Sequence, residues 1–200
     1  MQFLSYSNTI DPLVHEIRAF APQFVGIKAG DKVLDVCCGT GDQAFYYAEK
    51  GALAYGIDID PKMINTAEND KRRKNHRVSF QVADATKLPF EDEFFDYVSI
   101  SFGLHEKERT VRDKIISEMK RVVKKEGSII FIDFQIPFPN NFYSYIIKLI
   151  EYLAGKHHFQ CFKDYVKQGG LDKLLKKNQL IEEKRHLFKN NNIVMIKAIK

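Results

Sequence analysis

The segment from Val33 to Asp42 carries the strongest chemical signal in the chain, Val-Leu-Asp-Val-Cys-Cys-Gly-Thr-Gly-Asp. Its apolar residues predict a buried strand, and its glycines predict a turn that leads into a helix. Because glycine has no side chain, the backbone at Gly39 and Gly41 can approach a ligand closely. This pattern is typical of a site for a nucleotide-containing cofactor.

Three carboxylates accompany successive predicted strands on the ligand side of this turn. Asp35 lies inside the first strand, four residues before Gly39, where it can act directly or through water on an ammonium group. Asp58 ends the second strand, where a carboxylate can accept hydrogen bonds from ribose hydroxyls. Asp84 follows the third strand and can accept from an adenine amino group, while the N–H of Ala85 faces a ring nitrogen.

The glycine turn also satisfies the GxGxxA pattern of dinucleotide sites between Gly39 and Ala44, so an NAD(P)-dependent oxidoreductase is an alternative. Three features argue against it. An apolar residue would be more usual than Asp35 in a dinucleotide site, the acidic turn at Asp84 suits an adenine, and the predicted carboxy-terminal hairpin is foreign to the usual dinucleotide fold.

The order of predicted elements indicates the fold class. Strands alternate with helices of amphipathic spacing, and two antiparallel strands end the chain. We predict one α/β domain over residues 1–200, with a Rossmann-like doubly wound sheet of five parallel strands plus a carboxy-terminal antiparallel hairpin, seven strands in all. The predicted strands are residues 32–38, 53–57, 77–82, 95–101, 128–134, 180–188 and 193–199, and the predicted helices include 12–25, 42–50, one opened by Pro61, and 110–125 closed by Gly127.

A helical insertion of about residues 135–179 follows the fifth strand, at the edge where open α/β sheets bind ligands. It is rich in aromatic residues, which favours helices that cover the substrate; an extra core layer is the alternative. The aromatic residues are Phe138, Phe142, Tyr143, Tyr145, Tyr152, Phe159, Phe162 and Tyr165.

Four ordered motifs between Val33 and Phe134 resemble those of class I S-adenosylmethionine (SAM)-dependent methyltransferases: residues 35–42, 56–64, 84–90 and 95–98. More loosely, residues 37–42, 101–104 and 165–171 are similar to the ubiquinone/menaquinone biosynthesis C-methyltransferase family. The resemblance implies transfer of a methyl group from SAM, with S-adenosylhomocysteine (SAH) as product, to a small, apolar or aromatic, quinone-precursor-like acceptor. A non-catalytic SAM-binding protein is a further alternative.

The resemblance also implies which residues contact the cofactor. These are Asp35, Gly39 and Gly41 at the methionine end, Asp58 at the ribose, Asp84 and Ala85 at the adenine, Ile59 and Met63 on the two faces of the adenine ring, and the backbone of Ser101 at the sulfonium. Tyr6 resembles an amino-terminal tyrosine that folds over the cofactor, although a packing role suits it equally.

One loop departs from the quinone enzymes, which typically continue with an Arg-Asn pair after the motif at residues 101–104. This chain has His105-Glu106-Lys107-Glu108 there, which weakens the expectation of a quinone acceptor. We predict His105 as a general base for a phenol or an acidic ring carbon. His157 and His158 form a second candidate. No metal is expected, because no carboxylate or cysteine stands at ligand spacing beside these histidines in the sequence.

The net charge of +5 is too mild to require an anionic partner. Nucleic acid is not expected as a substrate, because the chain lacks both the Asn/Asp-Pro-Pro-aromatic run and the Pro-Cys pair of base-methylating enzymes. The basic run at residues 71–77 suits a solvated helix end. Three cysteines without a pairing framework, and no signal-like or spanning segment, suggest the cytoplasm. Peripheral membrane contact is left open, and the oligomeric state is not predicted.

Overall fold

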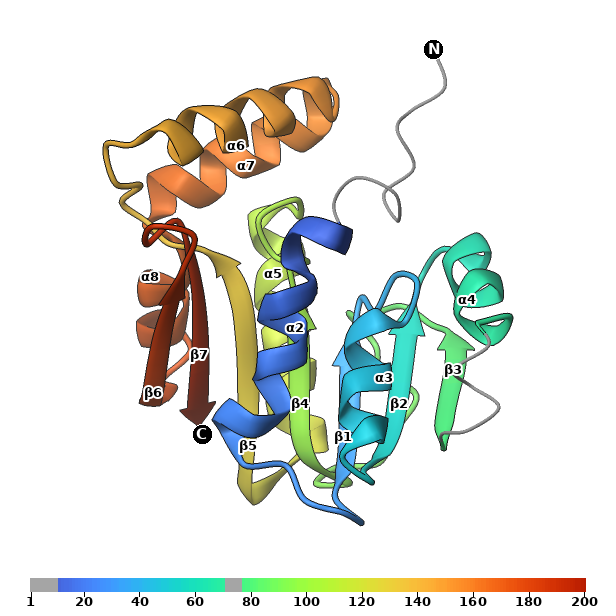
Figure 1. Ribbon diagram of the computed structural model, residues 1–200. Helices are drawn as coiled ribbons and strands as arrows, with labels where there is room; N and C mark the ends of the chain where they lie inside the picture. Colours follow the sequence, from blue (N-terminus) through green and yellow to red (C-terminus); the bar gives the residue numbers. More distant parts are fainter. Residues whose placement is uncertain (1–10, 71–76) are drawn as a thin grey trace.

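The computed structural model of the protein describes residues 11–70 and 77–200. Tyr6 and the basic residues 71–74 therefore lie outside the described residues. The strands stand side by side in one twisted sheet, with two helices, α6 and α7, beyond one edge of it (Figure 1).

The sheet contains seven strands in the order β3-β2-β1-β4-β5-β7-β6. Strands β1 to β5 pair in parallel, whereas β7 runs antiparallel to both β5 and β6. This arrangement confirms the predicted parallel sheet with a carboxy-terminal hairpin. The strands are β1 (Lys32–Val36), β2 (Leu53–Asp58), β3 (Val78–Val82), β4 (Phe95–Ser101), β5 (Val123–Phe134), β6 (Ile181–Phe188) and β7 (Ile193–Ile199).

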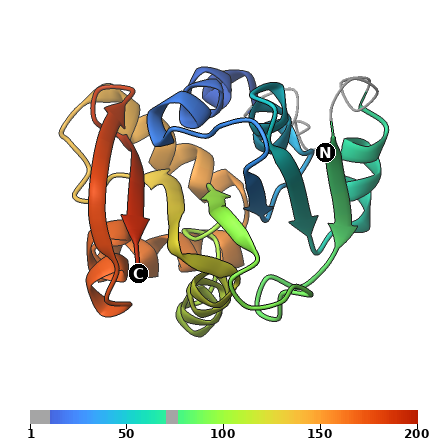
Figure 2. The ribbon, with the colours of Figure 1, turned by 90° about the horizontal axis from the view of Figure 1, so that it is seen from below.

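Helices cover both faces of the sheet, which is why the central strands are apolar on both sides. Helices α2 and α3 lie on one face, and α5 and α8 lie on the other (Figure 2). Valine, isoleucine and phenylalanine side chains of β1, β4 and β5 are buried between these layers. The helices are α2 (Asp11–Val25), α3 (Asp42–Glu49), α4 (Pro61–Glu68), α5 (Arg109–Val122), α6 (Phe142–Leu153), α7 (Lys156–Gln168) and α8 (Gly170–Lys177).

The boundary between α5 and β5 differs from the prediction. The helix ends at Val122, and the strand begins at once with Val123, which pairs with Phe95 across an irregular register. Gly127 therefore does not end a helix. A Cβ on Gly127 would lie 2.7 Å from the carbonyl oxygen of Asp96, so this glycine allows close approach to β4 instead.

The first strand is also shorter than predicted, because it ends at Val36 and Cys37 adopts a left-handed conformation with φ 56°. The strand thus turns toward the glycines two residues earlier than the apolar run suggests. The Cys38 side chain is buried, in agreement with the packing role of a small hydrophobic residue.

The insertion is helical, as predicted, but its aromatic residues divide between two environments. Phe162 and Tyr165 of α7 are buried, whereas Phe142, Tyr145 and Tyr152 of α6 are exposed. The helix α8 packs against β5 and β6 rather than over the sheet edge. No helix in the described parts of the chain combines the length and the apolar character needed to cross a membrane.

Candidate active site

The glycine turn between β1 and α3 gives its two predicted glycines different surroundings. A Cβ on Gly41, at φ 82°, would lie 2.5 Å from the Phe80 ring, so this position requires glycine for packing. Gly39 also has a positive φ, 53°, but no described atom lies within 4 Å of its Cβ position. Gly39 therefore borders open space, where the backbone can meet a ligand.

Asp58 at the end of β2 connects this turn to the next strand. Its Oδ2 accepts a hydrogen bond of 2.9 Å from the backbone N–H of Gly39, and its Oδ1 accepts one of 2.9 Å from the N–H of Asp60. Each carboxylate oxygen has two lone pairs, so both can accept a further hydrogen bond from a ribose hydroxyl. Asp58 is only half-buried, which keeps it within reach of a ligand.

Asp35 is the buried carboxylate beneath the turn, with 1% of its surface exposed. The Ser99 hydroxyl donates a 2.8 Å hydrogen bond to its Oδ1. Burial raises the pKa of Asp35 to about 7, although Ser99 and the charge of Arg18 oppose the shift. A cationic group bound nearby would stabilise the ionised form, so Asp35 is suited to an ammonium ligand.

The predicted adenine end lies at the tips of β2 and β3. Asp84 is exposed, and its Oδ1 accepts hydrogen bonds of 2.8 Å from both the N–H and the hydroxyl of Thr86, which hold its pKa below the usual value. Ala85 beside it is buried. Ile59 is 67% exposed and Met63 is half-buried, so apolar surface is available to an aromatic base here.

Ser101 ends β4 at the same edge of the sheet. Its hydroxyl oxygen is buried and has no hydrogen-bond partner among the described residues. A buried polar atom without a partner costs free energy unless a ligand or water satisfies it. The open space at Gly39, the exposed Ile59 and this hydroxyl together fit a bound nucleoside cofactor.

His105 follows β4 and is buried, with 4% of its surface exposed. Its Nδ1 lies 2.7 Å from Asp133 Oδ1, and its Nε2 lies 3.6 Å from Glu151 Oε2. Burial alone would lower the pKa of His105, but these carboxylates outweigh it and raise the pKa to about 9. The ring therefore carries a proton at neutral pH, and the predicted role as a general base requires that proton to leave first.

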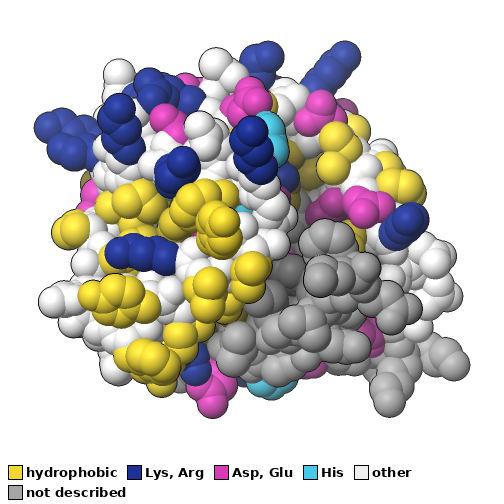
Figure 3. All heavy atoms as spheres, turned by 90° about the horizontal axis from the view of Figure 1, so that it is seen from above, with side chains coloured by type: hydrophobic (Ala, Val, Ile, Leu, Met, Phe, Trp, Pro, Cys, Tyr) yellow, Lys and Arg dark blue, Asp and Glu magenta, His cyan; other side chains and the backbone are white. Residues whose placement is uncertain are grey.

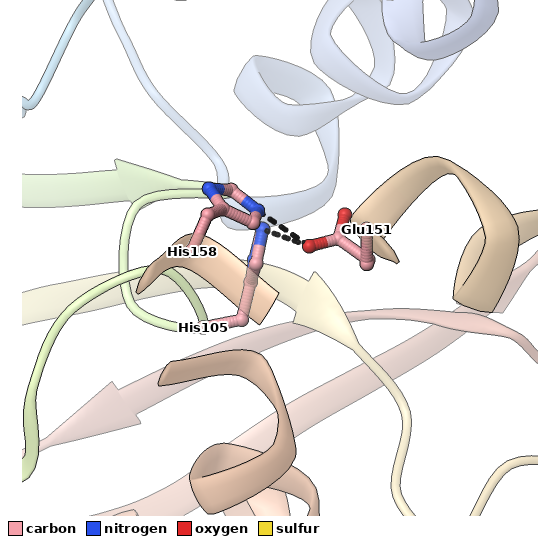
Figure 4. Close-up of side chains that lie close together, drawn as sticks. All are labelled: His105, Glu151 and His158. Carbon is pink, nitrogen blue, oxygen red and sulfur yellow. Dashed lines mark hydrogen bonds and ion pairs between the residues drawn. The ribbon is translucent and has the colours of Figure 1, made fainter. Parts of the chain in front are cut away.

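The second pair of predicted histidines separates in the structure. His158 Nε2 lies 2.6 Å from Glu151 Oε2, so one carboxylate oxygen faces both His105 and His158 (Figure 4). His157 instead has a side chain that is 78% exposed and points to Glu108. The sequence places no carboxylate at metal-ligand spacing from the histidines, but the fold brings Glu151 of α6 between them.

Asp133 and Glu151 are the two site residues that sequence analysis missed. Asp133 lies at the carboxyl end of β5, the same edge as Ser101, so its position in a predicted strand could have revealed it. Glu151 carries no such signal, because only the packing of α6 against α7 directs it to His105.

An aromatic wall stands beside His105. The ring of Phe134 lies 4.7 Å from the His105 ring, 5.8 Å from Phe102 and 5.9 Å from both Phe138 and Phe162, measured between ring centroids. These rings come from the loop after β4, from β5, from the loop after β5 and from α7. They form an apolar cluster at the sheet edge, in which Phe134 and Phe162 are buried and Phe102 and Phe138 are half-buried, next to the polar groups of the histidine cluster.

Residues 33–127 match the protein family described as a methyltransferase domain. Among solved structures, a protein of Pyrococcus horikoshii OT3 is similar with a TM-score of 0.72 and 21% identity, over 98% of this chain and 99% of that chain. Magnesium protoporphyrin IX methyltransferase from Synechocystis with bound SAH is similar with a TM-score of 0.69 and 20% identity, over 96% and 83%. The matched segment therefore resembles a methyltransferase domain, and the chain has the fold of SAM-dependent methyltransferases.

Several of the matching sequences are quinone C-methyltransferases. The ubiquinone/menaquinone biosynthesis C-methyltransferase UbiE of Citrifermentans bemidjiense is 34% identical over 149 residues, which cover 69% of this chain and 62% of that protein. The demethylmenaquinone methyltransferase of Lysinibacillus sphaericus is 33% identical over 70% of this chain and 62% of that protein. The chain therefore spans less than two thirds of the length of these relatives.

Proposed function

We propose that this chain transfers the methyl group of SAM to a small, apolar or aromatic acceptor, with a quinone precursor as the leading substrate class. The observation that carries the proposal is the convergence of Gly39, Asp58 and Ser101 with an aromatic wall at one edge of the sheet. The names of the sequence relatives support the quinone class. The loop at residues 105–108, which departs from those enzymes, is where the acceptor can differ.

Bound SAM supplies a methyl group already activated by its sulfonium. The residues therefore have to bind the two reactants, orient them and exclude water, and they need not form covalent intermediates. Asp35 suits the ammonium group, and Asp58 suits the ribose hydroxyls. Asp84 and Ala85 suit the edge of the adenine, and Ile59 lies where it can cover a face of the ring. Correct alignment of two reactants can supply about 7–11 kcal/mol of a barrier, which is enough to make positioning the main catalytic contribution.

The acceptor side is suited to a flat apolar molecule. Phe102, Phe134, Phe138 and Phe162 offer ring faces and edges, which favour aromatic ligands in stacked or edge-to-face contact. A buried apolar wall also keeps water from the sulfonium. The His105 ring lies 4.7 Å from the Phe134 ring, so the histidine cluster borders the acceptor side.

The exposed face of α6 supports delivery of a lipid-soluble acceptor by contact with a bilayer surface. Its apolar side chains recur at spacings of three and four residues, and Figure 3 shows apolar side chains gathered on the face seen from above, with basic side chains among and beside them. Phe142 is 75% exposed and Leu153 is 66% exposed. The exposed large apolar side chains of α6 are Phe142, Tyr143, Tyr145, Ile146, Leu149, Tyr152 and Leu153.

The bilayer contact is tested by sedimentation with anionic phosphatidylglycerol vesicles. We expect the wild-type protein to co-sediment and the double variant Leu149→Glu/Leu153→Glu to remain in the supernatant. The matched control is Ile181→Glu/Leu187→Glu, which adds two glutamates at exposed apolar positions of β6 and should co-sediment as the wild type does. Equal co-sedimentation of the wild type and the apolar-face variant, or self-association of the protein through this face, would contradict the contact.

Methyl transfer is tested with SAM and a short-chain demethylmenaquinone analogue, and SAH and the methylated product are detected by mass spectrometry. We expect both products in equal amounts, and neither with Asp58→Ala at a low SAM concentration. Absence of product from demethylmenaquinone analogues would exclude the quinone class, whereas transfer to another aromatic acceptor would retain the general proposal.

We place the reaction in the reducing cytoplasm, since Cys37, Cys38 and Cys161 are all free thiols.

A further inference from the structure

Three metal-binding side chains from separate parts of the chain converge at the edge of the sheet. His105 comes from the loop after β4, Glu151 from α6, and His158 from α7 (Figure 4). Their ligand atoms all lie within 4.8 Å of one another. Two imidazoles and one carboxylate form a set that binds zinc and other divalent transition metals in proteins.

The donor distances suit a bound ion. Glu151 Oε2 lies 2.6 Å from His158 Nε2 and 3.6 Å from His105 Nε2. A tetrahedral ion held at about 2.0–2.2 Å from each donor requires donor separations of roughly 3.3 Å. The required separation lies between these two distances and within the 4.8 Å that bounds all three donors, so an ion would require the Glu151 and His158 side chains to move apart.

The second nitrogen of each histidine faces a carboxylate that can orient the ring. Asp133 Oδ1 lies 2.7 Å from His105 Nδ1, and Glu106 Oε2 lies 3.7 Å from His158 Nδ1. Such carboxylate–histidine pairs are the usual outer partners of metal-binding histidines, since they fix the tautomer that directs the Nε2 lone pair to the ion. This second layer is an observation independent of the three donors.

The charges of the cluster also favour a cation. Glu151 and Asp133 are 5% and 1% exposed, so two carboxylates are buried within one small volume. Glu106 adds a third carboxylate, which pairs with Lys107. Buried carboxylates are costly unless a cation compensates them. A divalent ion between the histidines would supply that charge in place of the proton on His105, which leaves when the ion binds.

The cluster is open to solvent on one side. A pocket of about 480 Å³ is lined by His158, Glu106 and Lys107, together with residues of α5 and α7. His158 has a side chain that is 24% exposed, whereas His105 and Glu151 lie behind it. This pocket borders the cluster at His158, which is the side from which an ion can approach the donors.

We propose that His105, Glu151 and His158 form a binding site for a divalent transition-metal ion of the zinc type, with its fourth position free for water or an oxygen of the acceptor. With three protein ligands and one open position, the site has the composition of catalytic rather than structural zinc sites. The role at the acceptor rests on the proposed methyl transfer, but binding of the ion does not.

The test is titration of the chelator-treated, tag-free full chain with Co²⁺ and Zn²⁺. We expect one ion per chain, with the intense visible absorption of four-coordinate Co²⁺ and displacement of Co²⁺ by Zn²⁺. Glu151→Gln and His158→Ala should each weaken binding at least a hundredfold. His157→Ala, which removes the exposed neighbouring histidine, should bind both ions as the wild type does. Circular dichroism and SAM affinity, expected to be unchanged, report whether each variant remains folded.

Asp133→Asn and Glu106→Gln give a milder test that preserves all three donors. Loss of an outer partner typically weakens metal binding about 10–100-fold, so we expect a smaller loss than for the donor variants. Absence of stoichiometric binding to the folded wild type, or equal binding by His158→Ala and the wild type, would overturn the site. Either result would leave SAM binding, and hence the proposed function, intact.

Discussion

The two halves of the site at the edge of the sheet are built in different ways. The cofactor half consists of the β1–α3 turn and the tips of β2 and β4, where neighbouring parallel strands bring Gly39, Asp58 and Ser101 together. The acceptor half depends on α6 and α7, which meet only through tertiary packing. The order of the strands therefore positions the first half. The second half requires α6 and α7, whose positions do not follow from the order of the strands.

Their electrostatics differ in the same way. In the cofactor half, Asp35 is buried and accepts a hydrogen bond from Ser99, and burial raises its pKa. A cationic ligand would stabilise its ionised form. In the acceptor half, Asp133 and Glu151 already face His105. The protonation of Asp35 in the first half therefore depends on the bound ligand, whereas the second half is an internal network. We expect substitutions in that network to leave the affinity for SAM unchanged.

The largest expected effect concerns Arg112, which is fully buried and anchors the acceptor half. Its guanidinium donates to the carbonyl oxygens of Lys107 and Cys161 and to Asp164. We expect Arg112→Ala to lower the free energy of unfolding by about 3–5 kcal/mol, because buried acceptors lose their donor. Urea denaturation measures the change.

Arg109→Ala is the matched control, because Arg109 binds the same Asp164 from a side chain that is 51% exposed. We expect little or no loss of stability, as for other solvent-exposed ion pairs. Similar losses for the two variants would show that Arg112 does not anchor the loop to α7.

The next largest effect concerns the cofactor half. Asp58→Ala removes the acceptor of the Gly39 N–H and of the proposed ribose hydroxyls, so the affinity for SAM should fall about 10–100-fold, as expected for hydrogen bonds to a charged group. Isothermal titration calorimetry measures the change. The exposed Glu91→Ala is the control and should bind SAM as the wild type does. Unchanged affinity in Asp58→Ala would refute the ribose assignment.

A smaller effect follows from the pKa of Asp35, which burial raises to about 7. The ionised form attracts the ammonium of SAM, so affinity should rise about five- to tenfold between pH 6 and pH 7.5. Without SAM, the raised pKa of Asp35 has the opposite effect, because it lowers the stability of the fold as the pH rises. The native carboxyl binds its proton more tightly than the unfolded one, so its contribution to stability declines as the pH rises from about 4 to 7.

Asp35→Asn is the variant that isolates this titration. It should bind SAM more weakly at pH 7.5 and with little dependence on pH in the same range. If the affinity of the wild type were flat over this range, Asp35 would not sense the ammonium group.

Much of the fold could be predicted from the sequence because its signals are local. Apolar runs predict the strands, Pro61 correctly opens α4, and the polar turn before Ile193 predicts the hairpin. The start of β5 could not be predicted in this way. The segment between Val123 and Gly127 continues the amphipathic spacing of a helix, but its pairing with β4 makes it a strand.

In the site, too, some residues could be predicted from local sequence signals and others could not. Asp58 was predictable because the end of a parallel strand fixes its place, and His105 follows the next strand at that edge. Glu151 lies 46 residues beyond His105 on a helix whose other polar and aromatic residues are mostly exposed, so no spacing rule connects the two. Tertiary packing brings them together, and a single sequence does not encode that packing in a readable pattern.

The most direct test of the central claim, that this sheet edge binds SAM, is calorimetric titration of the full chain with SAH, SAM and NAD⁺. We expect one SAM or SAH site per chain and no heat from NAD⁺, with about 2.7 kcal/mol of added stability at a ligand concentration one hundred times Kd. A protein that binds NAD⁺, or that gives no heat and no thermal stabilisation with either SAM or SAH, would contradict the account.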